Sequence, residues 1–517
     1  MRQTHVGVSW GRRRTRVNVP VPGRDDGAVR PRLIAPALVA VVLAACSGDD
    51  ASFETRSGQG RRVTTTTTTA AETTTTAAPT SSAAAAGTTR PAPAQPATPT
   101  CPAVPARTEP RPDRTRYVLR IDVRLAENAV VGEVTARFTP DLATDRLVFR
   151  LWPNGPRPAS GGAHIDTGQA TVGGHPAEST LDNPTTLVVR TGGQFPAGRA
   201  VDVTVPWRLT LPGPLNDRIS RNGDAVRLGS FFPILAWEPG VGWATEPPTS
   251  GFAEASMLPS ADFAVSVAVP EGVDVLATGV PDGQGRWMST AVPEFAMSVG
   301  RFTVQTATVD APAPVTVSVG VQAGIAESPE SYLGKVVRSL RDFAARFGPY
   351  PWPTYTLAIT PGLGGGIEHP MHVMQGPGTQ GRTTSHEVAH MWFYGLVTSN
   401  AGRDPWLDEG LASYGEARFE HAEASFRSRT IPPEGRSRAG EPMTYWESRQ
   451  SAYYRSVYVQ GAQAVMAMGP LDRVDCALRH YVARSAHRVA RNADFIAAAS
   501  VVFSDAAATL ARYGIRP

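Results

Sequence analysis

One segment constrains the fold of this chain more than any other: His386-Glu387-Val388-Ala389-His390. Four residues on an α-helix advance by about 400°, so the two histidines project from one face, and both imidazoles can hold one metal ion. Glu387 lies about 100° around the helix from His386. It can therefore reach a water molecule beside the metal without binding the metal, as a general base must. The alternative is a pair of ordinary polar positions on an exposed helix.

A third metal ligand is expected downstream of this helix. A zinc site that performs hydrolysis uses three protein ligands and leaves a fourth position open for water. Glu409 follows His390 after eighteen intervening residues and opens the next helical pattern. The turn-forming residues in the connection 400–405 allow two antiparallel helices to bring their ends together. We therefore predict one zinc ion, bound by His386, His390 and Glu409.

The first 45 residues predict a lipoprotein signal peptide. Arg30 and Arg32 precede an apolar run, residues 33–46, that is too short to cross a bilayer and ends in Leu-Ala-Ala-Cys. This ending resembles a bacterial lipobox, in which Cys46 is acylated and becomes the new N-terminus; an ordinary signal peptide is the alternative. We expect an exported protein that is lipid-anchored to the outer face of the bacterial cytoplasmic membrane or cell envelope.

The next region, residues 46–114, predicts a disordered tether because it is rich in Thr, Ala and Pro and has hardly any large apolar side chain. The net charge of +4 arises from 50 basic and 46 acidic residues, and residues 1–45 alone carry eight Arg and two Asp, which leaves the remainder slightly acidic. This charge balance gives no support for a nucleic-acid partner. We expect contact with a membrane only through the lipid anchor, and the sequence carries no signal of oligomeric state.

Two folded regions follow the tether. Short alternating apolar runs separated by Gly, Pro and Asn fill residues 115–322 and predict a mostly antiparallel β-rich domain. From about residue 328 the period becomes helical, so residues 323–517 predict a mainly helical domain. The fold class is therefore multidomain α+β. In the second domain we expect one short strand at 355–359 and helices at 332–347, 383–396, 410–424, 451–468 and 474–486.

The motifs together resemble the aminopeptidase N family of gluzincin zinc metallopeptidases. After HExxH, Glu409 lies in the context Trp-Leu-Asp-Glu-Gly-Leu-Ala-Ser-Tyr; residues 364–369, Gly-Gly-Gly-Ile-Glu-His, are similar to the family's Gly-x-Met-Glu-Asn exopeptidase motif; and residues 458–462, Tyr-Val-Gln-Gly-Ala, are similar to its catalytic Tyr motif. The resemblance covers about 400 residues. It implies an N-terminal antiparallel β saddle-like domain followed by a thermolysin-like zinc peptidase domain. Three residues depart from the motifs: Ile367, His369 and Gln460 stand where the family has Met, Asn and Lys.

The resemblance also implies an activity and roles for individual residues. It implies a zinc-dependent aminopeptidase that removes N-terminal residues from extracytoplasmic peptides. Glu387 would serve as the general base, and Tyr458 would donate a hydrogen bond to the oxyanion as it forms. Gly365 and Gly366 would let the backbone approach the substrate, and Glu368 would hold its free α-ammonium. The alternatives are a zinc endopeptidase, which needs the same metal site but no amine anchor, and a catalytically silent envelope binding protein on the same fold.

The cysteines predict one disulfide bond. Three cysteines in 517 residues exclude a disulfide-based scaffold. Once Cys46 is acylated, only Cys101 and Cys476 remain, and both would lie in an oxidising compartment. A bond between them would join the end of the tether to the catalytic domain. The alternative is a buried, unbonded Cys476 and a solvent-exposed Cys101.

Overall fold

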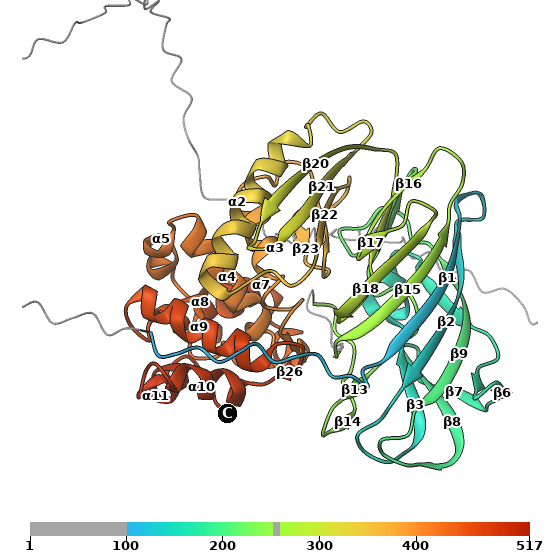
Figure 1. The fold of residues 1–517 in the computed structure, drawn as a ribbon, viewed down its shortest axis with the longest axis horizontal. Helices are drawn as coiled ribbons and strands as arrows, with labels where there is room; N and C mark the ends of the chain where they lie inside the picture. The colour runs from blue at the N-terminus through green and yellow to red at the C-terminus, as the bar shows by residue number, and fades with distance from the viewer. Residues whose placement is uncertain (1–100, 252–258) are drawn as a thin grey trace, which may run out of the picture. The chain divides into compact units, whose positions relative to one another are not determined.

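The computed structural model describes residues 101–251 and 259–517. The predicted signal peptide, Cys46 and most of the predicted tether therefore lie outside the described residues. Figure 1 shows that the chain changes from strands to helices along its length, as the sequence predicted, so the structure is of the α+β type. In the two described ranges no helix has both the length and the apolar character needed to cross a membrane.

A nine-stranded sheet forms the largest part of the β-rich region. Its strand order is β17-β18-β15-β1-β2-β9-β5-β6, with β4 also paired to β9. Strands β1 and β15 are parallel, and the other neighbours are antiparallel. Buried and exposed side chains alternate along the central strands, so one face packs on the core. The bounds are β1 (Arg116–Arg124), β2 (Ala129–Phe138), β4 (His164–Thr167), β5 (Thr171–Val172), β6 (His175–Pro176), β9 (Val201–Thr210), β15 (Ala261–Ala268), β17 (Val280–Pro281) and β18 (Arg286–Val292).

Two four-stranded sheets and a two-stranded pair complete this region. The first sheet has the order β10-β11-β19-β16, and the second has the order β12-β3-β8-β7. Loops between these strands line a cleft. The bounds are β3 (Thr144–Arg150), α1 (Pro156–Ser160), β7 (Ser179–Asn183), β8 (Thr186–Phe195), β10 (Ile219–Asn222), β11 (Ala225–Leu228), β12 (Ile234–Leu235), the pair β13 (Trp237–Glu238) and β14 (Gly242–Trp243), β16 (Asp274–Ala277) and β19 (Met297–Gly300).

A five-stranded sheet opens the mainly helical region, in the order β20-β21-β22-β24-β23. Its first two strands have the period-two pattern that led us to place them in the N-terminal domain, but β21 pairs in parallel with β22. The sheet therefore crosses the boundary predicted at residues 322 and 323. Alternation identifies a strand, whereas the sheet that the strand joins depends on tertiary packing. The bounds are β20 (Phe302–Asp310), β21 (Pro314–Gln322), β22 (Thr354–Ile359), β23 (Gly366–Ile367) and β24 (His372–Gln375).

The helices follow the predicted order with shifted ends. Helix α3 ends at Ala389 rather than at residue 396. Residues 391–397 continue in wide turns instead. Nearly all of them are buried, and their apolar side chains made this segment resemble a helix in the sequence. The predicted helix 451–468 contains a π-helical segment, η4 (Arg455–Val459). The helices are α2 (Glu330–Phe347), α3 (Arg382–Ala389), α4 (Trp406–Phe419), α5 (Glu423–Ser428), α6 (Met443–Trp446), α7 (Gln450–Tyr454), α8 (Gln460–Met466), α9 (Leu471–Ser485), α10 (Asn492–Ser500) and α11 (Ala506–Ala511), with short strands β25 (Thr398–Ser399) and β26 (Val489–Ala490).

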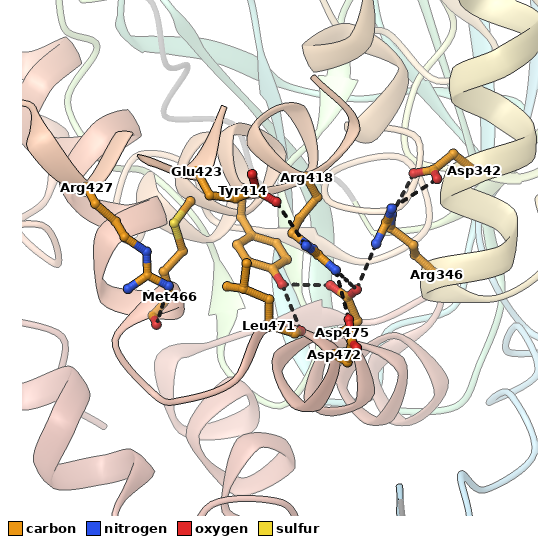
Figure 2. Close-up of polar contacts among 10 residues, drawn as sticks. All are labelled: Asp342, Arg346, Tyr414, Arg418, Glu423, Arg427, Met466, Leu471, Asp472 and Asp475. Atoms are coloured by element: carbon orange, nitrogen blue, oxygen red, sulfur yellow. Dashed lines mark hydrogen bonds and ion pairs between the residues drawn. The ribbon is translucent and has the colours of Figure 1, made fainter. Parts of the chain in front are cut away.

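Helix α4 is buried on almost every side, so each polar side chain on it needs a partner inside the protein. Figure 2 shows the partners on one face, where Asp475 of α9 accepts a hydrogen bond from the Tyr414 hydroxyl at 2.6 Å. The same carboxylate accepts from Arg418 of α4 and from Arg346 of α2, both at 3.0 Å. This network fixes α4 against α2 and α9. Glu409 projects from a different face of α4.

Residues 101–113, which we name the N-terminal strap, contain no helix or strand and lie along α9 (Figure 1). The predicted disulfide between Cys101 and Cys476 is present, with the two Cα atoms 5.7 Å apart. Thr108 donates its amide to the carbonyl of Ala483 at 2.8 Å. The predicted tether included the strap, but the disulfide and this backbone hydrogen bond hold the strap on the folded region.

Candidate metal centre and active-site cleft

Three side chains converge on one point between α3 and α4. The Nε2 atoms of His386 and His390 lie 3.0 Å apart, and Oε2 of Glu409 lies 3.2 Å and 3.4 Å from them. Ligand atoms at about 2.0–2.1 Å from a tetrahedral zinc ion are separated by roughly 3.3 Å. The three donor atoms therefore fit a single zinc ion, and the structure brings together the residues that the sequence predicted as ligands.

Two further carboxylates lie beside the imidazoles, and Nδ1 of His390 also donates a hydrogen bond to the carbonyl of Phe393 at 3.2 Å. Nδ1 of His390 lies 2.6 Å from Oδ1 of Asp408, and Nδ1 of His386 lies 3.4 Å from Oε2 of Glu416. A hydrogen on each Nδ1 leaves the lone pair of each Nε2 pointing at the shared centre, which is how proteins orient histidine ligands to metals. Neither residue was predicted from the sequence. For Glu416 the signal is its spacing from Glu409, since residues seven apart on a helix share one face.

The electrostatics of the centre favour a cation. Burial alone would lower the pKa of His386, but the carboxylates of Glu409 and Glu416 outweigh it and raise that pKa to about 9. The pKa of His390 is also raised, since Asp408 and Glu409 outweigh burial. The two neighbouring imidazoles hold the pKa of Glu409 well below its ordinary value, although burial opposes them. Positive charge is therefore stabilised at the point where the three donor atoms meet.

The Glu387 carboxylate lies against the edge strand β23. Glu387 is only 1% exposed, and a Cβ atom added at Gly366 would lie 2.3 Å from its Oε1. The missing side chain at Gly366 therefore makes the space that Glu387 occupies. Glu368 directly follows β23 and is half-buried; donor atoms of Glu368, Glu387 and His390 all lie within 4.8 Å of one another. The predicted general base and the predicted amine anchor thus share one side of the metal centre.

Tyr458 contacts two of the predicted ligands, Glu409 and His386. It belongs to the π-helical segment η4, and such segments occur frequently at functional sites. Its hydroxyl donates a hydrogen bond to Oε1 of Glu409 at 2.6 Å, and its ring stacks on His386 with the centroids 5.6 Å apart. The predicted oxyanion donor is therefore next to the metal centre, where it contacts a ligand.

Two residues that depart from the family motifs point away from the centre. Gln460 is buried, and its amide donates to the carbonyl of Gly435 at 2.8 Å while its oxygen accepts from the amide of Ser437 at 2.9 Å. It therefore supports a loop. His369 is 1% exposed, and its Nδ1 lies 2.7 Å from Oε1 of Glu294. Neither side chain lines the cleft that contains the predicted catalytic residues.

The metal centre lies in a cleft that both folded regions line. The cleft encloses about 880 Å³ of empty space, part of it open to solvent. The mainly helical region contributes the residues of the metal centre and also Glu368, Gly365 and Gly366. In the wall formed by the β-rich region, an ion pair joins Arg157 and Asp217 at 3.2 Å and stiffens that wall. The β-rich region contributes Trp152, Gly155, Pro156, Arg157, Pro158, Asn216, Asp217, Arg218, Pro248, Thr249 and Gly251.

Comparison with known proteins reveals similarity to aminopeptidases. No protein-family model matches the chain. The chain is 32% identical over 98 residues to aminopeptidase B of Homo sapiens, which is 17% of this chain and 15% of the relative. It is 34% identical over 83 residues to leucine aminopeptidase 2 of Aspergillus fumigatus, 14% of each chain, and 33% identical over 94 residues to leukotriene A-4 hydrolase of Xenopus laevis, 17% and 15%. The chain thus spans about 15% of the length of these relatives.

Solved structures match a much larger part of the chain. An M1 zinc metallopeptidase from Deinococcus radiodurans has 22% sequence identity and a TM-score of 0.56, and the match covers 78% of this chain and 94% of that one. A mutant of that enzyme bound to a Tyr-Ser-Ala substrate has 23% identity and a TM-score of 0.59, with coverage of 78% and 95%. The chain therefore has the fold of this metallopeptidase, and the resemblance to the aminopeptidase N (M1) family is confirmed.

Proposed function

From this fold and the geometry of the cleft, we propose that the chain is a zinc-dependent aminopeptidase that removes N-terminal residues from extracytoplasmic peptides. One observation carries the proposal: three ligand atoms lie within 3.4 Å of one another, with the carboxylates of Glu387 and Glu368 beside them. The β-rich region would be the saddle-like N-terminal domain, and the region from about residue 323 the thermolysin-like catalytic domain. A single zinc ion would occupy the centre.

The metal ligands and the general base have separate tasks. Zinc held by His386, His390 and Glu409 would acidify a water molecule and polarise the scissile carbonyl. Glu387 takes the proton of the attacking water and passes it to the leaving amine. The Glu387 carboxylate is buried against Gly366, so it keeps one orientation toward the reacting atoms. That fixed orientation is what a proton acceptor needs.

Glu368 supplies the charge that selects the first peptide bond. A substrate cut at that bond carries its α-ammonium on the same residue as the scissile carbonyl, so an anionic anchor must lie near the metal centre. The donor atom of Glu368 lies within 4.8 Å of those of Glu387 and His390, which meets this requirement. An endopeptidase needs no such charge. In this proposal Tyr458 turns its hydroxyl from Glu409 to the oxyanion and donates a hydrogen bond to it.

Three variants test these roles. Glu387→Gln should retain zinc and lose nearly all turnover, because it removes the proton acceptor and leaves the ligands in place. Glu409→Ala should lose zinc, and equal zinc content in this variant and the wild type would show that the third ligand is another residue. Glu368→Ala should keep zinc, raise KM and lower kcat for free-amine substrates, at a combined cost of a few kcal/mol. Unchanged kinetics in the Glu368 variant would favour an endopeptidase.

We further propose that the protein is a lipoprotein anchored through Cys46. The basic flank, the short apolar run and the small residues before Cys46 support this proposal. Two acyl chains on one N-terminus anchor a protein firmly, whereas one chain gives only reversible binding. Cys46→Ser should move the protein from the membrane fraction to the soluble fraction. Mass spectrometry that finds an unmodified mature N-terminus in the wild type would contradict the proposal.

A further inference from the structure

A buried carboxylate outside the metal centre connects several segments around the cleft. Glu294 lies just before β19 and is 0% exposed. Its Oε1 lies 2.7 Å from Nδ1 of His369 and accepts a hydrogen bond from the hydroxyl of Tyr394, while Oε2 accepts from Oγ of Ser230 at 2.9 Å. A buried carboxylate is tolerated only when such donors replace water.

These contacts also keep Glu294 ionised. Burial alone would raise the pKa of Glu294, but the neighbouring His369 and Tyr394, together with the positive charge of Arg218, outweigh it and lower the pKa to about 2. Arg218 also lines the cleft. Glu294 therefore acts as a permanent negative charge that holds groups from both folded regions.

Two of the contacts link Glu294 to the two segments that carry Glu368 and the predicted ligand His390. His369 directly follows Glu368; Glu368 lines the cleft, whereas His369 is buried. The contact between Glu294 and His369 therefore holds the backbone that carries the amine anchor. Tyr394 lies four residues after His390, so the contact between Glu294 and Tyr394 holds the segment that follows the metal-binding helix α3.

The turn that carries Glu368 needs this support. Strand β23 is only two residues long and lies at the edge of its sheet, so few backbone hydrogen bonds fix it. After Glu368 the backbone turns sharply, with a φ of 61° at Met371. His369 is tightly enclosed, because a Cβ atom added at Gly229 would lie 2.1 Å from its Nε2. Because the His369 side chain cannot move, it also fixes the backbone of the preceding residue, Glu368.

We propose that Glu294 is a positioning residue that sets the distance between Glu368 and the metal centre, and that it thereby restricts cleavage to the first peptide bond. This inference rests on the proposed aminopeptidase function. Glu294 itself touches no substrate in this scheme, since it is fully buried. One residue of extended chain spans only about 3.3–3.6 Å, so even a small displacement of Glu368 weakens the preference for the first bond. Misplacement by about 1 Å commonly costs on the order of 100-fold in rate.

The test compares Glu294→Ala and Glu294→Gln in the full, zinc-loaded protein. The assays are kcat and KM for leucine 4-nitroanilide, product analysis of a free hexapeptide, and zinc content. Glu294→Ala should raise KM about tenfold or more and should release dipeptides as well as single residues, with zinc content unchanged. Glu294→Gln keeps an acceptor for Tyr394 and His369, so it should restore most of the wild-type KM.

A matched control separates positioning from general stability. His372 is another buried histidine, the first residue of β24, and its Nε2 lies 3.0 Å from Oγ of Ser298 in the β-rich region. His372→Ala should lower the melting temperature and leave KM and the products unchanged. Should Glu294→Ala not fold, Tyr394→Phe removes one donor from the same carboxylate and should still raise KM, by about threefold for one lost hydrogen bond of this kind.

The outcomes distinguish this inference from the proposed function. If Glu294→Ala and Tyr394→Phe keep the wild-type KM and release only single residues, the positioning role is overturned while the aminopeptidase proposal stands. An equal rise in KM in His372→Ala would also overturn it, because loss of stability would then explain the effect. If the wild type releases no N-terminal residue from any free peptide, the proposed function fails first.

Discussion

Gly366→Ala is the substitution whose effect follows most directly from the geometry. The added Cβ atom would lie 2.3 Å from Cδ and Oε1 of Glu387 and 2.4 Å from its Cγ. Carbon atoms in contact are normally about 3.5–4.0 Å apart, so the carboxylate must move by about 1 Å or more. The alanine itself is compatible with the backbone, since Gly366 does not have a positive φ. The substitution therefore displaces the predicted general base and leaves the fold in place.

The size of the effect follows from this displacement. A 1 Å misplacement of a reacting group commonly costs on the order of 100-fold in rate, which corresponds to about 2.7 kcal/mol of activation free energy. The loss should appear in kcat, because the metal ligands are untouched. Zinc content should be unchanged, and the melting temperature should fall moderately, because the added methyl group overpacks a buried site.

Gly364→Ala is the matched control, since it adds the same methyl group two residues away in the same loop. A Cβ atom at Gly364 would lie 3.5 Å from Nδ2 of Asn216, which is an ordinary contact. This variant should retain wild-type kcat in the same assay of aminoacyl nitroanilide hydrolysis. If Gly366→Ala also retains wild-type kcat, the Glu387 carboxylate either does not need its observed position or is not the base, and the reasoning is refuted.

Three further predictions concern the support of the site and the stability of the fold. Glu416→Gln should lower zinc affinity by about 10- to 100-fold in a chelator competition, because Glu416 orients His386; unchanged affinity would remove it from the metal centre. The pKa of Glu294 is lowered to about 2 from 4.5, so its charge stabilises the fold above pH 4.5, and about 2 kcal/mol of unfolding free energy should be lost by pH 3. Denaturant titration should show that Glu294→Gln lacks this loss, and equal losses would contradict the assignment. Reduction of the Cys101–Cys476 disulfide should lower the unfolding free energy by about 2–5 kcal/mol. Thermal melts of the wild type and of Cys101→Ser, each with and without reductant, measure this loss. An unchanged melting temperature of the wild type in reductant would contradict the prediction.

Hydrophobic periodicity predicted the elements whose burial is one-sided. Strand β1 alternates between buried and exposed positions, and α2 has a clear apolar face, so both were readable from the sequence. Helix α4 is buried all around, and residues 391–397 are buried without being helical, so in these segments the apolar pattern could not fix the helix ends. The membership of β20 and β21 in the catalytic sheet depends on pairing with a strand more than thirty residues away, which periodicity does not encode.

The candidate metal centre was predictable because its signal is local. Two histidines one turn apart and a glutamate at the start of the next helix share a geometry that helix periodicity dictates. The supporting contacts are not local. Glu294 reaches His369 across 75 residues of sequence, and Gly366 is needed only because α3 packs Glu387 against β23. Such contacts require the tertiary structure, since no spacing rule connects the residues involved.

If a zinc centre and an adjacent amine anchor make this protein an aminopeptidase, its activity must depend both on zinc and on a free N-terminus of the substrate. Zinc-loaded protein is incubated with a peptide and with the same peptide acetylated at its N-terminus, and the products are identified by mass spectrometry. We expect stepwise loss of single N-terminal residues from the free peptide, at least about 100-fold slower cleavage of the acetylated peptide, and loss of all activity on removal of zinc. Internal cleavage of the acetylated peptide at the rate of the free one would show that the protein is not an aminopeptidase.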